Sequence, residues 1–176
     1  MSRHTMLRPP QRWARNAAWI SALAGLGPVL WRIHMLIWGA GWDLAPQYRS
    51  SPTLVGYVSL LIIGEAAASI APLGLVQWWG EVWPSWIPRL GGKRISPRFV
   101  VTVATSGTAL VTLLVFPLLG RLFWATSAGI DNPILQVHGR HRTFLLAHYL
   151  FWPLWPIGLW VALFGFYKRW FGNKPS

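Results

Sequence analysis

Long apolar runs separated by short polar segments dominate this sequence. The clearest run covers residues 53–77 and contains one formally charged side chain, Glu65, at its centre. A run of this length can cross the hydrocarbon core of a bilayer, which takes about 20 residues in a helix. A backbone inside a bilayer must satisfy its own polar groups, so each such run is expected to be helical.

The pattern predicts an all-α fold, a bundle of four transmembrane helices. The predicted spans cover about residues 17–40, 53–77, 99–120 and 145–167. Proline removes a backbone donor and clashes with the preceding turn, so the Trp-Pro-Leu-Trp-Pro sequence at 152–156 predicts a broken or kinked fourth helix. Pro72 is expected to kink only the last turns of the second helix.

Both ends of the chain are predicted to be basic tails, at residues 1–16 and 168–176. The N-terminal region resembles a signal peptide, with a basic head and an apolar run. The run continues far beyond the length of a signal peptide, so we expect a retained first span that acts as a signal anchor.

The distribution of Lys and Arg predicts the orientation in the membrane. The two tails and the loop at 78–98 carry eleven of the 16 basic residues. The other two connections carry four: Arg49, Arg121, Arg140 and Arg142. Basic residues accumulate on the cytoplasmic side of membrane proteins, so both termini are predicted to be cytoplasmic, in a bacterial plasma membrane.

Composition supports a membrane protein and excludes some chemistry. The chain is 53% hydrophobic and 11% charged, whereas about a quarter of the residues are charged in a typical soluble domain. Its net charge of +12 comes mostly from residues that flank apolar runs, which favours contact with anionic lipid over nucleic acid. There is no cysteine, so disulfides, thiol catalysis and cysteine-ligated metals are excluded.

The loop at 78–98 combines aromatic and basic side chains. Tryptophan collects at the depth of the lipid headgroups, and Lys and Arg contact lipid phosphates. We therefore predict interfacial lipid contacts at Trp78, Trp79, Trp83, Trp86, Arg89, Lys93, Arg94 and Arg98.

Arg32 and Glu65 form the sharpest candidate for a polar site. The first span runs outward and the second inward, and their short connection makes them antiparallel neighbours. Arg32 is predicted to lie about 4–5 Å outside the midplane, at nearly the depth of Glu65. Two interpretations stay open: the pair holds two helices together, or it lines a water- or ligand-filled cavity.

His34 and His148 are predicted to lie at similar depth in the outer half of the bundle. Two such histidines could ligate haem or a metal, hydrogen-bond between helices, or belong to a proton path. No cofactor and no metal are expected unless this pair binds haem. His138 and His141 lie beside two arginines. They are expected to belong to a solvated loop or to contact an anion or a lipid headgroup.

Small and hydroxylated residues indicate how the helices pack. The sequence Gly-Glu-Ala-Ala-Ala-Ser at 64–69, extended by Gly56 and Gly74, predicts a face that another helix approaches closely. A mildly polar stripe recurs at helical spacing, formed by Thr102, Thr105, Ala109 and Thr112, and its hydroxyls are expected to bond to carbonyls of their own helix. The alternative is that this stripe lines a pocket together with Glu65.

Two segments resemble parts of known proteins. The sequence WGEVWPSWIPRLGGKRISP at 79–97 resembles a segment of small, uncharacterised bacterial membrane proteins with about four spans. In these proteins Trp-Gly ends a span, and Pro-x-Trp-x-Pro and a Gly-Gly-basic turn follow. His34, Trp38 and Gly41 are similar to their His-x-x-x-Trp-x-x-Gly element. The resemblance implies the four-span topology.

A more distant similarity is to four-span sterol-isomerase-like proteins. These place acidic residues, His and Trp in a membrane cavity, but this sequence lacks their paired acidic motif.

Three classes of function remain open on the sequence. The first is binding or conduction of a small amphiphile, ion or proton at a site formed by Arg32, His34, Glu65 and His148. The second is a membrane-embedded enzyme with Glu65 and His34 as an acid–base pair. The third is a structural or accessory subunit. Because four spans rarely enclose a path alone, we expect a homo-oligomer or a partner membrane subunit.

Overall fold

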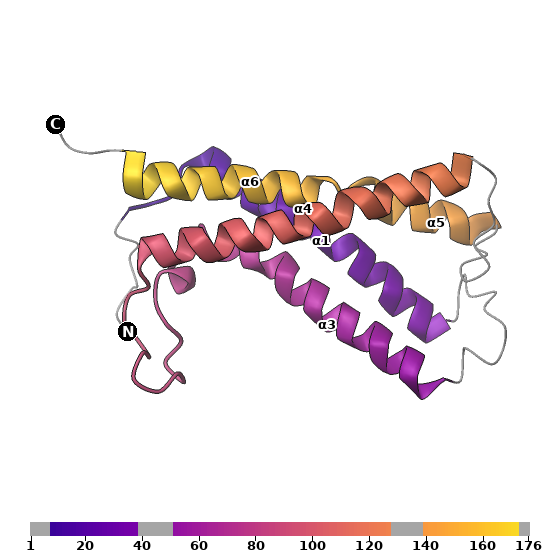
Figure 1. Ribbon diagram of the computed structural model, residues 1–176, viewed down its shortest axis with the longest axis horizontal. Coiled ribbons are helices and arrows are strands. Elements are labelled where there is room, and N and C mark those ends of the chain that lie inside the picture. Colours follow the sequence, from indigo (N-terminus) through magenta and orange to yellow (C-terminus); the bar gives the residue numbers. More distant parts are fainter. Residues whose placement is uncertain (1–7, 39–50, 128–138, 173–176) are drawn as a thin grey trace.

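The computed structural model describes residues 8–38, 51–127 and 139–172 as a bundle of helices (Figure 1). The elements are α1 (Arg12–Trp38), α3 (Pro52–Gly74), the short 3₁₀ helix η1 (Trp78–Gly80), α4 (Pro97–Ser127), α5 (Gly139–Leu150), α6 (Leu154–Tyr167) and the π-helical turn η2 (Lys168–Gly172). The described ranges contain no strand, only one isolated bridge between Val82 and Arg94. The predicted all-α bundle is confirmed.

Four stretches are long and apolar enough to cross a membrane: Arg12–Ile37, Pro52–Gly74, Pro97–Arg121 and Thr143–Gly172. These correspond to the four predicted spans. The first helix begins at Arg12 and α4 continues to Ser127, beyond the predicted limits of 17 and 120. Hydropathy marks only the part of a helix in hydrocarbon, whereas the backbone hydrogen bonds continue into the polar interface.

The fourth span is broken, as its prolines predict. The chain leaves α5 after Leu150, turns through residues 151–153, and starts α6 at Leu154. Tight hydrogen bonds stabilise this turn, including Trp152 N–H to Tyr149 O at 3.1 Å and Leu154 N–H to Phe151 O at 3.0 Å. On either side of the break, α5 and α6 both contact α1.

The centre of the bundle is the contact between α1 and α6, and α1 packs with comparable extent against α3. Small side chains allow α1 and α6 to approach each other closely. A Cβ added at Gly158 would lie 2.7 Å from Ser21 Cβ and 2.8 Å from Ala17 O, and one at Gly165 would overlap Ala14. The close-packing residues are therefore glycines of α6 against alanines and serine of α1.

The predicted small face at 64–69 is confirmed in part. A Cβ added at Gly56 or Gly64 would meet no atom of the described residues within 4 Å, so these two glycines do not contribute to it. The later part of the segment does pack: Ser69 is fully buried against Gly25 of α1, and Ala68 packs against the core cluster that contains Ala24. Gly74 contacts the ring of Trp79.

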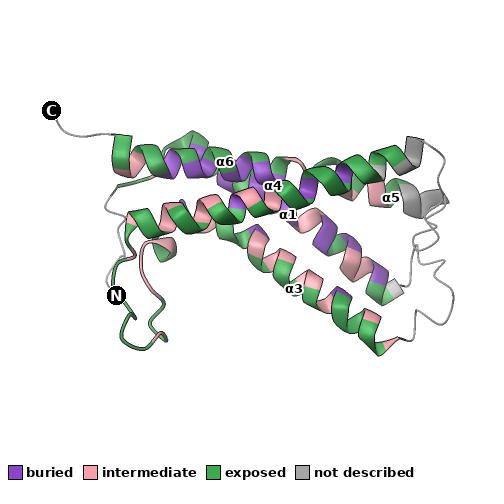
Figure 2. Ribbon diagram, viewed as in Figure 1, coloured by how far each residue is buried: buried purple, intermediate pink, exposed green. Residues whose placement is uncertain are grey.

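α3 is the most peripheral long helix. Within its most apolar 18 residues 11% are buried, against 44% for α1. α3 and α4 separate with increasing distance from the end of the bundle where the described chain begins and ends (Figure 1). Most of the surface of α3 is exposed (Figure 2).

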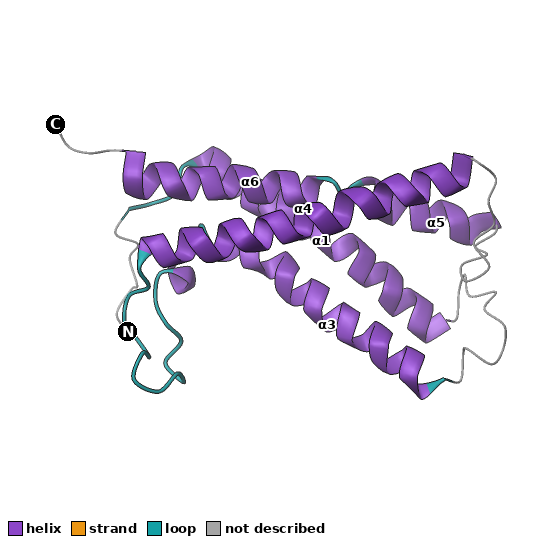
Figure 3. Ribbon diagram, in the orientation of Figure 1, coloured by secondary structure: helices purple, strands orange, loops and turns teal. Residues whose placement is uncertain are grey.

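Both ends of the described chain and the loop at 78–98 lie at the same end of the bundle (Figure 3). Arg8 and Arg169 are in direct contact there, with Arg8 Nη1 donating to Arg169 O at 3.0 Å. The described parts of the two predicted basic tails thus lie at the same end of the bundle as the basic loop.

Two threonines of α4 differ in their hydrogen bonding. Thr112 Oγ1 donates to Thr108 O at 2.7 Å and accepts from Trp160 Nε1 at 3.2 Å, so it joins α4 to α6. Thr108 is 1% exposed, and its Oγ1 has no hydrogen-bond partner among the described residues. The predicted bond to the helix's own backbone is made by Thr112, and also by Thr102 to Arg98 O at 3.0 Å.

We expect Thr108→Val and Thr112→Val to change stability in opposite directions. An unsatisfied buried hydroxyl costs about 1–3 kcal/mol, so Thr108→Val should raise the free energy of unfolding by about 1 kcal/mol. Thr112→Val should lower it by about 1 kcal/mol, since it removes the partner of Trp160. Thermal unfolding of both variants in the same detergent provides the measurement, and a loss of stability in Thr108→Val would contradict the assignment.

Candidate functional site: an intramembrane ion pair and a basic loop

Arg32 and Glu65 meet between α1 and α3. Arg32 Nη1 donates to Glu65 Oε2, and the pair is both a hydrogen bond and a salt bridge. The contact predicted from the depth of the two residues is therefore present. The side chains retain 15% and 17% of their exposed surface, so this chain covers most of the pair but not all of it.

Tyr149 is the residue near this pair that sequence reasoning missed. It lies at the end of α5 and interacts electrostatically with both Arg32 and Glu65. Its ring contacts Trp152 edge-on, with centroids 5.0 Å apart. Nothing in the local sequence marks this tyrosine; it packs, partly buried, against the core cluster that contains Ala24 of α1 and Trp155 of α6.

His34 and His148 are brought into one ring cluster, but Phe144 joins them. The Phe144 centroid lies 5.0 Å from that of His34 and 4.2 Å from that of His148. Trp31 completes the cluster, 6.0 Å from His34. His148 Nδ1 lies 2.8 Å from Phe144 O, where it donates to a carbonyl of its own helix.

This geometry matches a helix contact better than a pair of ligands. A phenyl ring between two imidazoles occupies space that an iron or a second ligand would need. The described residues contain no cluster of three or more His, Asp or Glu side chains able to hold a metal ion. The haem hypothesis stays a prediction.

Two cavities are relevant to the candidate site, and neither is lined by Arg32 or Glu65. One, of about 240 Å³, lies between α1 and α5 and is lined by Leu23, Gly27 and His148 among others. The other, of about 330 Å³, lies between α3 and α4. Of the four predicted site residues, only His148 faces either cavity.

The loop at 78–98 is an ordered, hairpin-like structure. Trp83 N–H donates to Lys93 O at 2.9 Å, Gly92 N–H to Trp83 O at 3.0 Å, and Ile95 N–H to Glu81 O at 2.9 Å. Gly92 turns the chain with φ +75°, a conformation that glycine adopts easily. The turn predicted at the two glycines is thus confirmed.

The loop presents its basic side chains outward. Arg89, Lys93, Arg94 and Arg98 are all exposed. Trp86 is 79% exposed, whereas Trp83 is partly buried against Phe99. Exposure of rings and cations at one end of the bundle fits the predicted interfacial role, and contact with lipid stays a prediction.

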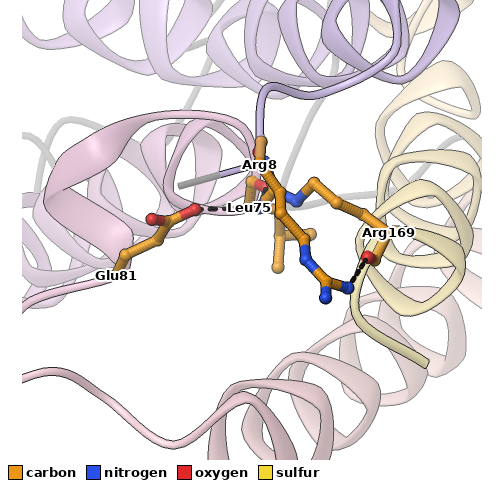
Figure 4. A network of polar contacts seen from close by, with 4 residues as sticks. All are labelled: Arg8, Leu75, Glu81 and Arg169. Atoms are coloured by element: carbon orange, nitrogen blue, oxygen red, sulfur yellow. Dashed lines mark hydrogen bonds and ion pairs between the residues drawn. The ribbon is translucent and has the colours of Figure 1, made fainter. Parts of the chain in front are cut away.

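A cluster that the sequence did not indicate ties this loop to both ends of the chain (Figure 4). Arg169 Nη2 lies 3.3 Å from Glu81 Oε1 and donates to Leu75 O at 3.1 Å. Arg169 Nη1 also donates to Arg8 O at 3.2 Å. The scarcity of carboxylates was a usable signal, because Glu81 is one of only four Asp and Glu residues in the chain.

One predicted cluster cannot be placed. His138 lies outside the described residues, as do the side chains of Arg140, His141 and Arg142.

The fold and the site together define a class: a helical multi-pass protein with four helices long and apolar enough to span a membrane. Comparison of the chain with protein families, curated protein sequences and solved structures gave no match. The resemblance to small bacterial four-span proteins stays a prediction.

Proposed function

We propose that the protein is a structural or accessory subunit of a membrane assembly, located in the bacterial plasma membrane with both termini in the cytoplasm. The orientation is supported by the position of the basic loop and of both ends of the described chain at one end of the bundle. Membrane proteins keep such a face in the cytoplasm.

The observation that carries the proposal is the open face of α3. Leu60 and Ile63 are 71% and 66% exposed, and a Cβ at Gly56 or Gly64 on the same helix would meet nothing within 4 Å in the part of the chain that the structure describes. Glycines on a membrane helix let a second helix approach closely, which increases packing between the two. A second copy of this chain, or a helix of a partner subunit, fits this face.

In this role the Arg32–Glu65 pair fixes α3 on α1. Two charges that meet inside a membrane relieve each other's desolvation cost, and a one-sided change would separate the helices. The pair sets the angle at which α3 presents its open face.

A second candidate function is binding of a small amphiphile, ion or proton at the Arg32–Glu65 pair. The residual exposure of both side chains favours it, as does the adjacent Tyr149. Glu65 is engaged by Arg32, which supports binding more than acid–base catalysis with His34.

Cysteine cross-linking in membranes tests the proposed assembly. The chain has no cysteine, so single substitutions give an unambiguous readout. Leu60→Cys and Ile63→Cys are expected to give a discrete cross-linked species with a bifunctional maleimide, because both positions lie on the open face. Leu113→Cys on α4 is the matched control, with the same 71% exposure as Leu60.

Absence of a discrete product at both α3 positions would contradict the proposal. So would equal cross-linking at residue 113, which would indicate random collisions in the bilayer. The size of the product distinguishes a second copy from a different subunit.

A further inference from the structure

The cavity of about 330 Å³ forms a groove between α3 and α4, with the loop at 78–98 at one end. Its walls are small or apolar, with one buried hydroxyl at Thr108. They include Ala71 and Gly74 of α3, Val103 and Gly107 of α4, and Trp83 and Ile95 of the loop. Gly107 is open towards the groove, since a Cβ there would meet nothing within 4 Å.

The length of the groove matches one leaflet of a bilayer. Its lining along α4 runs from Phe99 to Val111. At 1.5 Å per residue this is about 18 Å. Half of a hydrocarbon core is about 15 Å thick, so the groove extends from the interface to the middle of the membrane.

The cavity is narrow for its length. Spread over about 18 Å, its volume of about 330 Å³ gives a mean cross-section of roughly 18 Å², whereas a helix about 10 Å wide has a cross-section of roughly 80 Å². An extended acyl chain is narrower and lies along such a groove without displacing its walls.

The charge at the end of the groove is positive and exposed. Arg94 and Arg98 directly precede Ile95 and Phe99, which line the groove, and both arginines are exposed. The nearest carboxylate of the loop, Glu81, is bound by Arg169 and does not neutralise them. The loop that lines one end of the groove with Trp83 and Ile95 thus carries exposed guanidinium groups next in sequence to lining residues.

We propose that this groove binds one anionic phospholipid of the leaflet that contains the 78–98 loop. The acyl chain lies along α4 past Gly107, and the phosphate is held by Arg94 and Arg98. This site is separate from the open face of α3 and from the Arg32–Glu65 pair, so it does not depend on the proposed assembly.

Native mass spectrometry of the purified full-length protein tests the acyl-chain part. The probes are phosphatidylglycerol and phosphatidylcholine with identical chains. The wild type is expected to retain one phosphatidylglycerol in preference to phosphatidylcholine. Gly107→Leu fills the groove and should lose this lipid. Gly120→Leu should keep it, because Gly120 is equally open on the same helix but does not line the groove.

The headgroup part is tested by a charge variant. Arg94→Gln with Arg98→Gln is expected to reduce the preference for phosphatidylglycerol roughly 30-fold, given the usual energy of a basic residue at an anionic surface. Arg12→Gln with Arg15→Gln removes the same charge from the same end of the bundle and should leave the preference within about threefold of wild type.

Three results would overturn the proposal. The first is equal retention of the two lipids by the wild type. The second is lipid binding by Gly107→Leu that equals that of Gly120→Leu. The third is a dimer that is lost in Gly107→Leu while the lipid count stays unchanged, which would assign the groove to a second copy of the chain.

Discussion

Glu65→Leu is expected to lower the free energy of unfolding by about 3–5 kcal/mol, because it leaves Arg32 charged and unpaired inside the membrane. Arg32→Leu should cost less. A carboxyl group can become neutral by taking up a proton, whereas a guanidinium stays charged in proteins. Thermal or denaturant unfolding in one detergent compares the two variants.

The double variant Arg32→Leu with Glu65→Leu is the control for this prediction. Replacement of a buried ion pair by apolar residues is often neutral or stabilising, so the double variant should unfold within about 1–2 kcal/mol of wild type. If each single variant were as stable as wild type, the contact would have no structural role. A stable double variant that loses binding of a specific small molecule would favour the second candidate function.

Gly158→Ala and Gly64→Ala are expected to shift stability in opposite directions. The added methyl group at Gly158 would lie 2.7 Å from Ser21 Cβ and 2.8 Å from Ala17 O, so α6 must move away from α1. Overpacking of this kind costs about 1–3 kcal/mol. At Gly64 the methyl group meets open space, and the higher helix propensity of alanine should add up to about 1 kcal/mol.

The same unfolding assay in detergent measures both alanine variants. Gly158→Leu extends the series, and its yield of folded protein should fall sharply. If Gly158→Ala were as stable as Gly64→Ala, the α1–α6 contact would not be the centre of the bundle. In membranes, a specific defect of Gly64→Ala in cross-linking at Leu60→Cys would support the proposed helix contact on α3.

The candidate ion pair was predictable because topology restricts it strongly. Two apolar runs joined by a short connection must be antiparallel neighbours. Two opposite charges at similar depth on these helices then have few other partners with which to form an ion pair. The histidine pair was predicted less well. Depth placed His34 and His148 at the same level, but depth does not specify which side of a helix faces a neighbour, and Phe144 lies between them in the structure.

The packing face at 64–69 was predicted only in part, and the cause is physical. Glycine and alanine allow close approach wherever they occur, so composition alone favoured the whole segment. Close packing needs a complementary surface on a second helix. α6 supplies this for α1 through Gly158 and Gly165, whereas a Cβ at Gly64 would meet no atom of the described residues within 4 Å.

The sequence by itself determined the four apolar helices, the break of the fourth span near its two prolines, the basic end of the bundle and the partner of Glu65. These features depend on hydropathy, proline and charge, which act locally or along the membrane normal. Only the tertiary structure decided which helices form the core, that Arg169 engages Glu81, and that α3 and α4 leave a groove between them. These depend on the rotation of each helix about its own axis, which side-chain packing across helices sets.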